Sequence, residues 1–243
     1  MSIWVRIGEI LSKVSKDVVS GEAFSGVVEA VRTVFAGEPE VRRQVGFSIA
    51  MIALSAKMAK ADGIVTSDEV DAFQQLFAIP PREANNVARL YNLAKQDVAG
   101  YHAYAKQVKN LFPDNSIIYK DVIDGLFHIA KADGVIHEKE LLFLDDIAGI
   151  FGLSDRDYER LKMRHMEPET GDPYLLLDAD KSWDFERLRK HYLQLVKDNH
   201  PDMLIAHGVP EEFVAIANNR LACINHAWEM IEAERHPRAK EDA

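Results

Sequence analysis

The triplet His200-Pro201-Asp202 lies where a basic amphipathic run gives way to the stretch MLIAHG. A histidine and an aspartate this close could work as an acid–base pair, but such a pair also needs a nucleophile or a substrate pocket. The neighbouring segment contains no serine, cysteine or metal constellation that would complete such a site. Proline alone would also end a helix, because it lacks the amide hydrogen. The triplet is therefore either a plain helix stop or a surface that contacts another molecule.

Acidic residues that could bind a metal occur in an internal repeat. The stretches AKADGIVTSDEVDAF and AKADGVIHEKELLFL share Ala-Lys-Ala-Asp-Gly, two β-branched residues and a later glutamate. The candidate ligands are Asp62, Glu69, Asp133 and Glu140. Neither copy has the alternating acidic pattern of a twelve-residue calcium loop. The alternative is that the aspartates accept hydrogen bonds from turn amides and the glutamates cap helices. Two hairpins lying together could still pool their carboxylates around a divalent cation.

The elements that carry these residues all show helical periodicity, and alternating strand patterns are missing. Each repeat stands between two helical patterns, predicted at Phe47 to Ala61, Asp68 to Phe77, Val122 to Ala132 and Glu138 to Phe151. Glycine after Ala-Asp allows the chain to leave a helix, and Thr66 with Glu69 fits a capping box for the next one. Each copy is therefore predicted to be a helical hairpin. The predicted fold class is all-α, with a pseudo-repeated helical bundle.

A proline- and glycine-containing stretch, HMEPETGDP, separates this bundle from a second helical unit. The predicted organisation is an N-terminal helical segment (1–41), the bundle (42–163), a linker (164–171), a C-terminal unit (172–236) and a tail (237–243). In the C-terminal unit, Asp172 and Pro173 open a short helix, a second helix starts near Ser182, and a last one runs from about Glu211 to Arg235. The last two are predicted to form a hairpin with the triplet exposed at its tip.

The faces of these two helices differ in character. The apolar face of the second helix holds Phe185, Leu188, Tyr192, Leu195 and Val196, and its polar face holds Arg187, Arg189, Lys190, His191 and Lys197. The inward face of the last helix holds Phe213, Ala217, Leu221, Ile224, Ala227, Trp228 and Ile231. A helix with one apolar and one charged face packs on a core and presents the charges to solvent.

Composition limits the other classes of function. The formal net charge of -10 disfavours nucleic-acid binding, and the single Cys223 excludes an intrachain disulfide. No apolar run is long enough for a transmembrane helix. The amphipathic start, with Trp4, is predicted to pack on its own protein or on a second copy in a homodimer; a membrane-surface helix is the alternative.

Two resemblances follow from these motifs. The duplicated KADG hairpins, from about Arg42 to Met163, resemble the TerB-like domain, which implies an all-helical bundle whose acidic residues are sometimes proposed to hold a metal. A short aromatic-bearing helix, a basic amphipathic helix, His-Pro-Asp and a long last helix, from about Asp172 to Arg235, resemble the J domain. A TerB-like bundle followed by a J domain resembles the layout of the DjlA-like co-chaperones.

These resemblances imply a function and its residues. The chain would be no enzyme and would require no cofactor; it would stimulate ATP hydrolysis by a DnaK-type chaperone while the TerB-like bundle recruits an unidentified client or partner. The triplet and the basic residues Arg187, Arg189, Lys190 and Lys197 would contact the chaperone. The chain departs from the pattern at Leu193, Gln194 and Asp198, where basic residues are more usual. It also lacks the membrane-spanning segment typical of DjlA-like proteins, so a soluble, cytoplasmic relative is predicted. The alternative function is a metal-binding, stress-linked adaptor with a weak or vestigial J domain.

Overall fold

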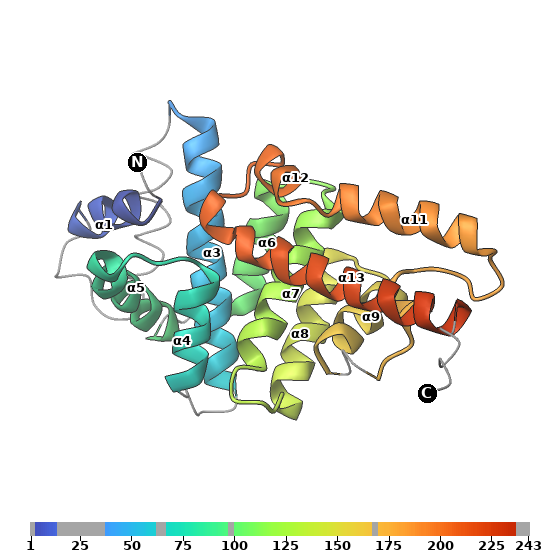
Figure 1. Cartoon of the computed structure of the whole chain (residues 1–243). Helices are drawn as coiled ribbons and strands as arrows, with labels where there is room; N and C mark the ends of the chain where they lie inside the picture. Colours follow the sequence, from blue (N-terminus) through green and yellow to red (C-terminus); the bar gives the residue numbers. More distant parts are fainter. Residues whose placement is uncertain (1–2, 14–36, 62–66, 97–99, 167–169, 237–243) are drawn as a thin grey trace.

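The computed structural model describes residues 3–13, 37–61, 67–96, 100–166 and 170–236, and these are helical with no strand among them (Figure 1). The predicted all-α class is therefore confirmed. The larger part of the molecule contains α1 (Ile3–Lys13), α3 (Pro39–Ala61), α4 (Ser67–Leu76), η1 (Pro81–Glu83), α5 (Ala84–Gln96), α6 (Tyr101–Leu111), α7 (Ser116–Ala130), α8 (Glu138–Phe151) and α9 (Asp155–Met166). The smaller part contains α10 (Pro173–Leu176), α11 (Phe185–Asp198), α12 (Pro201–Ala206), η2 (Glu211–Phe213) and α13 (Val214–Arg235).

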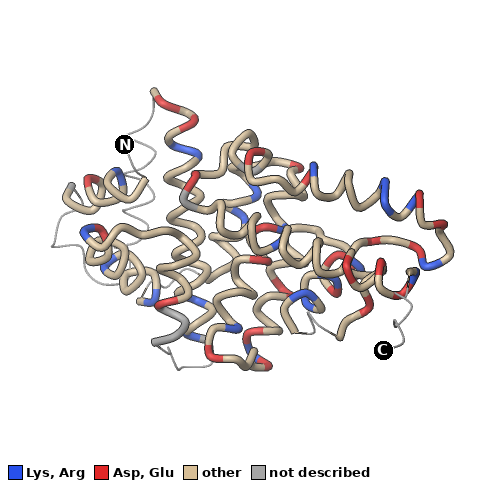
Figure 2. The backbone as a smooth tube through the Cα atoms, viewed as in Figure 1, with Lys and Arg blue, Asp and Glu red and all other residues tan. Residues whose placement is uncertain are grey.

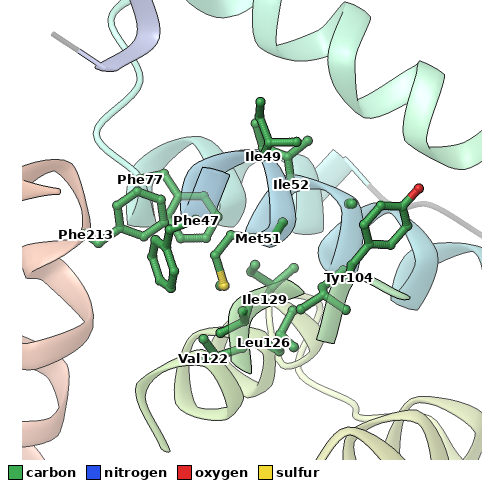
Figure 3. Close-up of a cluster of buried hydrophobic side chains, with 14 of the residues drawn as sticks. Phe47, Ile49, Met51, Ile52, Phe77, Tyr104, Val122, Leu126, Ile129 and Phe213 are labelled. Carbon is green, nitrogen blue, oxygen red and sulfur yellow. The ribbon is translucent and has the colours of Figure 1, made fainter. Parts of the chain in front are cut away.

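Helix α3 is the centre of the larger part. Most of its side chains from Val45 to Ala59 are buried, because the neighbouring helices α1, α5, α6, α7 and α8 all pack against it. Figure 3 shows Phe47 and Met51 of α3 on the side of α7, near Val122 and Leu126, and Ile52 with Ile49 on another side of α3. A helix that is apolar on nearly every side is stable only inside such a bundle.

Local signals end and begin the helices as expected in several places. Gly152 ends α8 with a φ of 75°, which glycine adopts without steric cost. The side chain of Asp172 accepts a hydrogen bond from the amide of Tyr174 at 2.9 Å and starts α10 at Pro173. The cap of α11 differs from the prediction: it is Asp184, whose carboxylate accepts from the Arg187 amide at 2.7 Å, and Ser182 lies before the helix.

The hydrophobic interior divides along α13. Its first half joins the larger core through Ile216 and Ala217. Phe213, the fully buried residue just before α13, lies in that core 4.7 Å from Phe77 and 5.0 Å from Phe47, measured between ring centroids (Figure 3). The second half of α13, with Ile224, Trp228 and Ile231, belongs to a smaller core with α10 and α11. The prediction that Phe213 packs within the C-terminal unit is therefore wrong. One helix is shared by both cores, so the two parts are not independent units.

The smaller core is built on aromatic packing. Tyr192 of α11 stacks on Trp228 of α13 with 4.8 Å between ring centroids, and Phe185 packs on the same indole at 5.5 Å. Helices α11 and α13 pack together and run in opposite directions (Figure 1). His191, expected on the open polar face, instead lies 2.7 Å from the Leu177 carbonyl oxygen through its Nε2 atom.

Ion pairs also join the two parts. Arg220 of α13 pairs with Asp121 of α7, and both side chains are buried. Asp178, between α10 and α11, pairs with Arg156 at 2.8 Å and with Arg160 at 3.2 Å, both on α9. Because α9 extends to Met166, residues 164–166 are helical although they were assigned to the linker. The C-terminal unit is therefore fixed on the bundle by charge as well as by packing.

Candidate partner-binding site

The triplet begins a short helix. Helix α11 ends at Asp198, and Pro201 is the first residue of α12. The carbonyl oxygen of His200 accepts from the Met203 amide at 2.9 Å, as expected for the residue before a helix. Proline suits this position because its missing amide hydrogen would have no partner there. The predicted end of the preceding helix is thus correct, and the predicted loop is replaced by α12.

The imidazole of His200 lies on the surface with 54% of its side chain exposed. Its Nδ1 atom accepts a hydrogen bond from the Asp202 amide at 3.2 Å and lies 3.4 Å from a carboxylate oxygen of Asp202. Asp202 is 85% exposed. Since Nδ1 is used within the triplet, Nε2 is the ring nitrogen left for a second molecule. The triplet therefore presents a preorganised imidazole and an open carboxylate to solvent.

Basic side chains lie exposed along α11, which leads to the triplet. Arg187, Arg189, Lys190 and Lys197 are all exposed, and Figure 2 shows basic residues along this helix. The guanidinium of Arg187 stacks 4.1 Å from the centre of the Trp183 ring, which restricts its position. The structure therefore brings these four cations onto α11, the helix that ends two residues before His200.

The triplet does not lie at a free tip. After α12, the ring nitrogen Nδ1 of His207 is 3.5 Å from the side-chain amide of Asn115, and Val209 is buried in the larger core. Gly208 has a φ of 85°, and a Cβ atom there would lie 2.8 Å from a carboxylate oxygen of Glu40. The end of α11 that points away from the bundle is the opposite one (Figure 1). The predicted protruding tip is therefore a corner formed with the bundle.

Of the four candidate metal ligands, two are described at the level of side chains. Asp133 accepts from the Val135 amide at 3.0 Å, and buried Glu140 accepts from the His137 amide at 2.9 Å. Both contacts agree with the alternative in which the aspartate stabilises a turn and the glutamate caps a helix. Asp62 and the side chain of Glu69 lie outside the described residues. Within the ranges that the structure covers, no three histidine, cysteine or acidic residues gather as metal ligands. Each described carboxylate thus accepts from an amide of its own turn, and the divalent metal stays a prediction.

Sequence reasoning missed a buried ionic network between α7, α9 and α13. Asp124 of α7 accepts from Arg164 at 2.9 Å, and its other oxygen is 2.6 Å from Nε2 of His165. Burial alone would raise the pKa of Asp124, but the nearby Arg164 and His165 outweigh it and lower that pKa. Burial lowers the pKa of Arg220 to about 10, so this guanidinium stays charged at neutral pH opposite Asp121. The signal in the sequence was Asp121 and Asp124, one turn apart in a mostly apolar helix.

Comparisons with known proteins show what the chain is similar to. Residues 48–163 match the family model described as Tellurite resistance protein TerB. Over its wider length, the chain is similar to co-chaperone proteins named DjlA. The DjlA of Photobacterium profundum is 24% identical over 94% of this chain and 90% of its own length. Those of Vibrio cholerae (25% identical, 82% of each chain) and Legionella pneumophila (23% identical, 77% of this chain and 76% of that protein) are also similar. No solved structure matches the chain.

These matches confirm the predicted resemblance to the DjlA-like co-chaperones, at low identity. The similar proteins carry names of co-chaperones rather than of enzymes, which agrees with the expectation of a non-enzymatic protein.

The predicted cytoplasmic location has to be corrected. It was drawn from the lack of a long apolar run, and no helix in the described ranges combines the length and hydropathy that crossing a membrane requires. The proteins that the chain matches over most of its length are nevertheless DjlA co-chaperones, for which the resemblance implied a membrane-spanning segment. The prediction of a cytoplasmic location, which rested on the lack of a long apolar run, is therefore wrong.

Proposed function

We propose that this chain is a co-chaperone that stimulates ATP hydrolysis by a DnaK-type chaperone. The observation that carries the proposal is the exposed triplet His200-Pro201-Asp202 at the end of a helix with an exposed basic face. The similarity to DjlA co-chaperones supports the same role. We name the surface made by α11, the triplet and α12 the docking corner.

Charge would bring the docking corner to an acidic surface of the chaperone. The chain as a whole carries a formal net charge of -10, so the cations of α11 stand out locally against an acidic background. Arg189, Lys190 and Lys197 are exposed and near the triplet in sequence, and such rim charges mainly accelerate and orient association. Because these charges are exposed, added salt should weaken the contact.

The triplet would then act on the chaperone after docking. His200 and Asp202 offer one nitrogen and one carboxylate in a fixed arrangement, and a ligand shifts an equilibrium only through contacts that differ between two states. The docking corner would therefore bind the hydrolysis-competent state of the chaperone better than the other states. ATP and its metal ion belong to the chaperone, and this chain supplies no reacting group. The TerB-like bundle, residues 42–163, would recruit the client or another partner.

Binding to the chaperone in two nucleotide states tests this proposal. The full chain is immobilised, and the cognate DnaK-type chaperone is passed over it with ATP or with ADP. We expect preferential binding with ATP, and a loss of that preference when His200→Gln removes the imidazole. His226→Gln, which changes another exposed histidine, should bind like the wild type. Equal binding in both nucleotide states, or none, would overturn the proposal.

A further inference from the structure

A cleft runs beside the triplet, between the docking corner and the bundle. Its volume is about 350 Å³, and residues of α7 and α9 form one wall while residues of α11 and α12 form the other. Its lining includes Ile117 and Lys120 of α7, Asp157 of α9, Leu195 and Asp198 of α11, and Met203 of α12. Asn199, the residue before His200, also lines it. The cleft is therefore continuous with the docking corner.

The cleft is lined by both apolar and charged side chains, and its charged lining includes Arg160 and Arg164 of α9, Arg220 of α13 and Asp178. Ile117, Leu195 and Met203 supply aliphatic surface, and Met203 is 39% exposed although it is a large apolar side chain. Lys120 and Asp157 pair at 2.7 Å on the bundle side, and exposed Asp198 lies on the opposite side. Partly exposed apolar side chains and the charged groups beside them can both contribute to a protein–protein contact.

The two walls of the cleft are held in place. Asp178 is bound by two arginines of α9, and the buried pair of Asp121 and Arg220 joins α7 to α13. Phe213, next to α13, is anchored in the larger core. Because these contacts fix the docking corner on the bundle, a protein that approaches His200 also meets the surface of α7.

We propose that the chaperone docks on a composite surface, in which the TerB-like bundle contributes Ile117 and Lys120 beside the docking corner. This inference rests on the proposed function. The cleft would receive an aliphatic side chain of the chaperone that lies next to the acidic surface bound by α11. Covering the exposed apolar surface of Met203 favours such a contact. The bundle would thus help to select the chaperone as well as recruit a client.

Neutral polar substitutions in the cleft test the composite surface without changing its charge. Ile117→Asn changes the bundle side and Met203→Asn changes the docking corner. The matched control is Leu142→Asn on α8, where the leucine is 64% exposed and does not line the cleft. Stimulation of ATP hydrolysis by the cognate DnaK-type chaperone is measured over a range of concentrations of the full chain. The melting temperature of each variant shows whether it is folded.

We expect both cleft variants to raise the concentration for half-maximal stimulation by about tenfold, as for interface residues whose truncation clearly weakens binding. The maximal stimulation should stay the same, because the triplet is intact. Ile117 is only partly buried, so the milder Ile117→Ala keeps the bundle side of the cleft testable should Ile117→Asn fail to fold. If the folded Ile117 variant behaves like Leu142→Asn while the wild type stimulates, the composite surface is wrong and the proposed function stands, whatever Met203→Asn does, because Met203 belongs to the docking corner. If the wild type does not stimulate, both proposals fail.

Discussion

Replacing Phe213 by alanine should destabilise both parts of the molecule at once. Phe213 is fully buried, and its ring lies 4.7 Å from that of Phe77, 5.0 Å from that of Phe47 and 6.3 Å from that of Trp4. It precedes α13, whose second half forms the smaller core with α10 and α11. Removing the ring leaves a cavity in the larger core and loosens the start of the helix that connects the two.

The size of the effect follows from the burial of the ring. A fully buried phenylalanine replaced by alanine costs about 3–5 kcal/mol of the free energy of unfolding, from lost apolar burial and the cavity left behind. In a protein of this length, about 1 kcal/mol lowers the melting temperature by roughly 2–4 °C. The expected fall in melting temperature is therefore about 6–20 °C. Phe213→Leu keeps most of the volume and should cost under about 1.5 kcal/mol.

Urea unfolding of two single-tryptophan chains measures this effect in each core separately. Trp4 reports on the larger core and Trp228 on the smaller one. We expect the two fluorescence transitions to coincide, and Phe213→Ala to move both to lower urea concentration by the same amount. A Trp228 transition that stays in place while the Trp4 transition moves would refute the idea of a shared helix. The idea would also be refuted if Phe213→Ala lowered the free energy of unfolding by less than about 1 kcal/mol, because a cavity of this kind costs more.

Three further results are expected. Lys190→Glu should weaken stimulation of the chaperone several-fold, with the loss shrinking as salt is added, whereas Lys139→Glu on α8 should not. Burial, and then the nearby His165, lower the pKa of His128 below its usual value of about 6.5, so the neutral form is favoured in the folded state. The stability that the neutral His128 contributes is complete above the usual histidine pKa and is lost as the pH falls below it. Between about pH 7.5 and 5.5, the free energy of unfolding of His128→Gln should therefore fall less than that of the wild type or of His226→Gln, as measured by urea unfolding. Saturating Ca²⁺ or Zn²⁺ should leave the melting temperatures of the wild type and of Glu140→Gln unchanged, because Glu140 caps its own helix; a saturable rise in the wild type alone would contradict this.

The helical fold was predictable because its signals are local. The periodic pattern predicted Glu138 to Phe151, and α8 has those bounds. The pattern from Val122 to Ala132 corresponds to α7, which starts earlier, at Ser116, where Asn115 caps the helix through its side chain. Caps and apolar periodicity depend on residues within one or two turns, which a sequence displays directly. The turn of the first repeat lies outside the described residues, so the pseudo-repeat stays a prediction.

The partners of each apolar face were not predictable in the same way. The apolar stripe of the predicted last helix indicated correctly that Phe213 and Ile231 are buried, but Phe213 packs in the larger core and Ile231 in the smaller one. Periodicity identifies a face that must be covered, and long-range packing decides what covers it. For the same reason the exposure of His200 could be expected, while its position beside the bundle could not.

The buried charges show a similar limit. Asp121 and Asp124 interrupt an apolar helix, which indicates that they need partners. The partners, Arg220 on α13 and Arg164 on α9, are distant in the sequence, and arginines in helices of mixed composition give no sign of burial. Only the fold identifies these pairs.

Single-turnover hydrolysis of ATP by the cognate DnaK-type chaperone tests the central claim most directly. Preformed chaperone–ATP complex is mixed with the full chain, and the rate of hydrolysis is followed with increasing amounts of wild type, His200→Gln or His226→Gln. The account predicts a saturable acceleration by the wild type and by His226→Gln, and a loss of acceleration with His200→Gln, since the imidazole exposed at the docking corner acts on the chaperone. Acceleration by His200→Gln equal to that of the wild type, or no acceleration by the wild type, would contradict it.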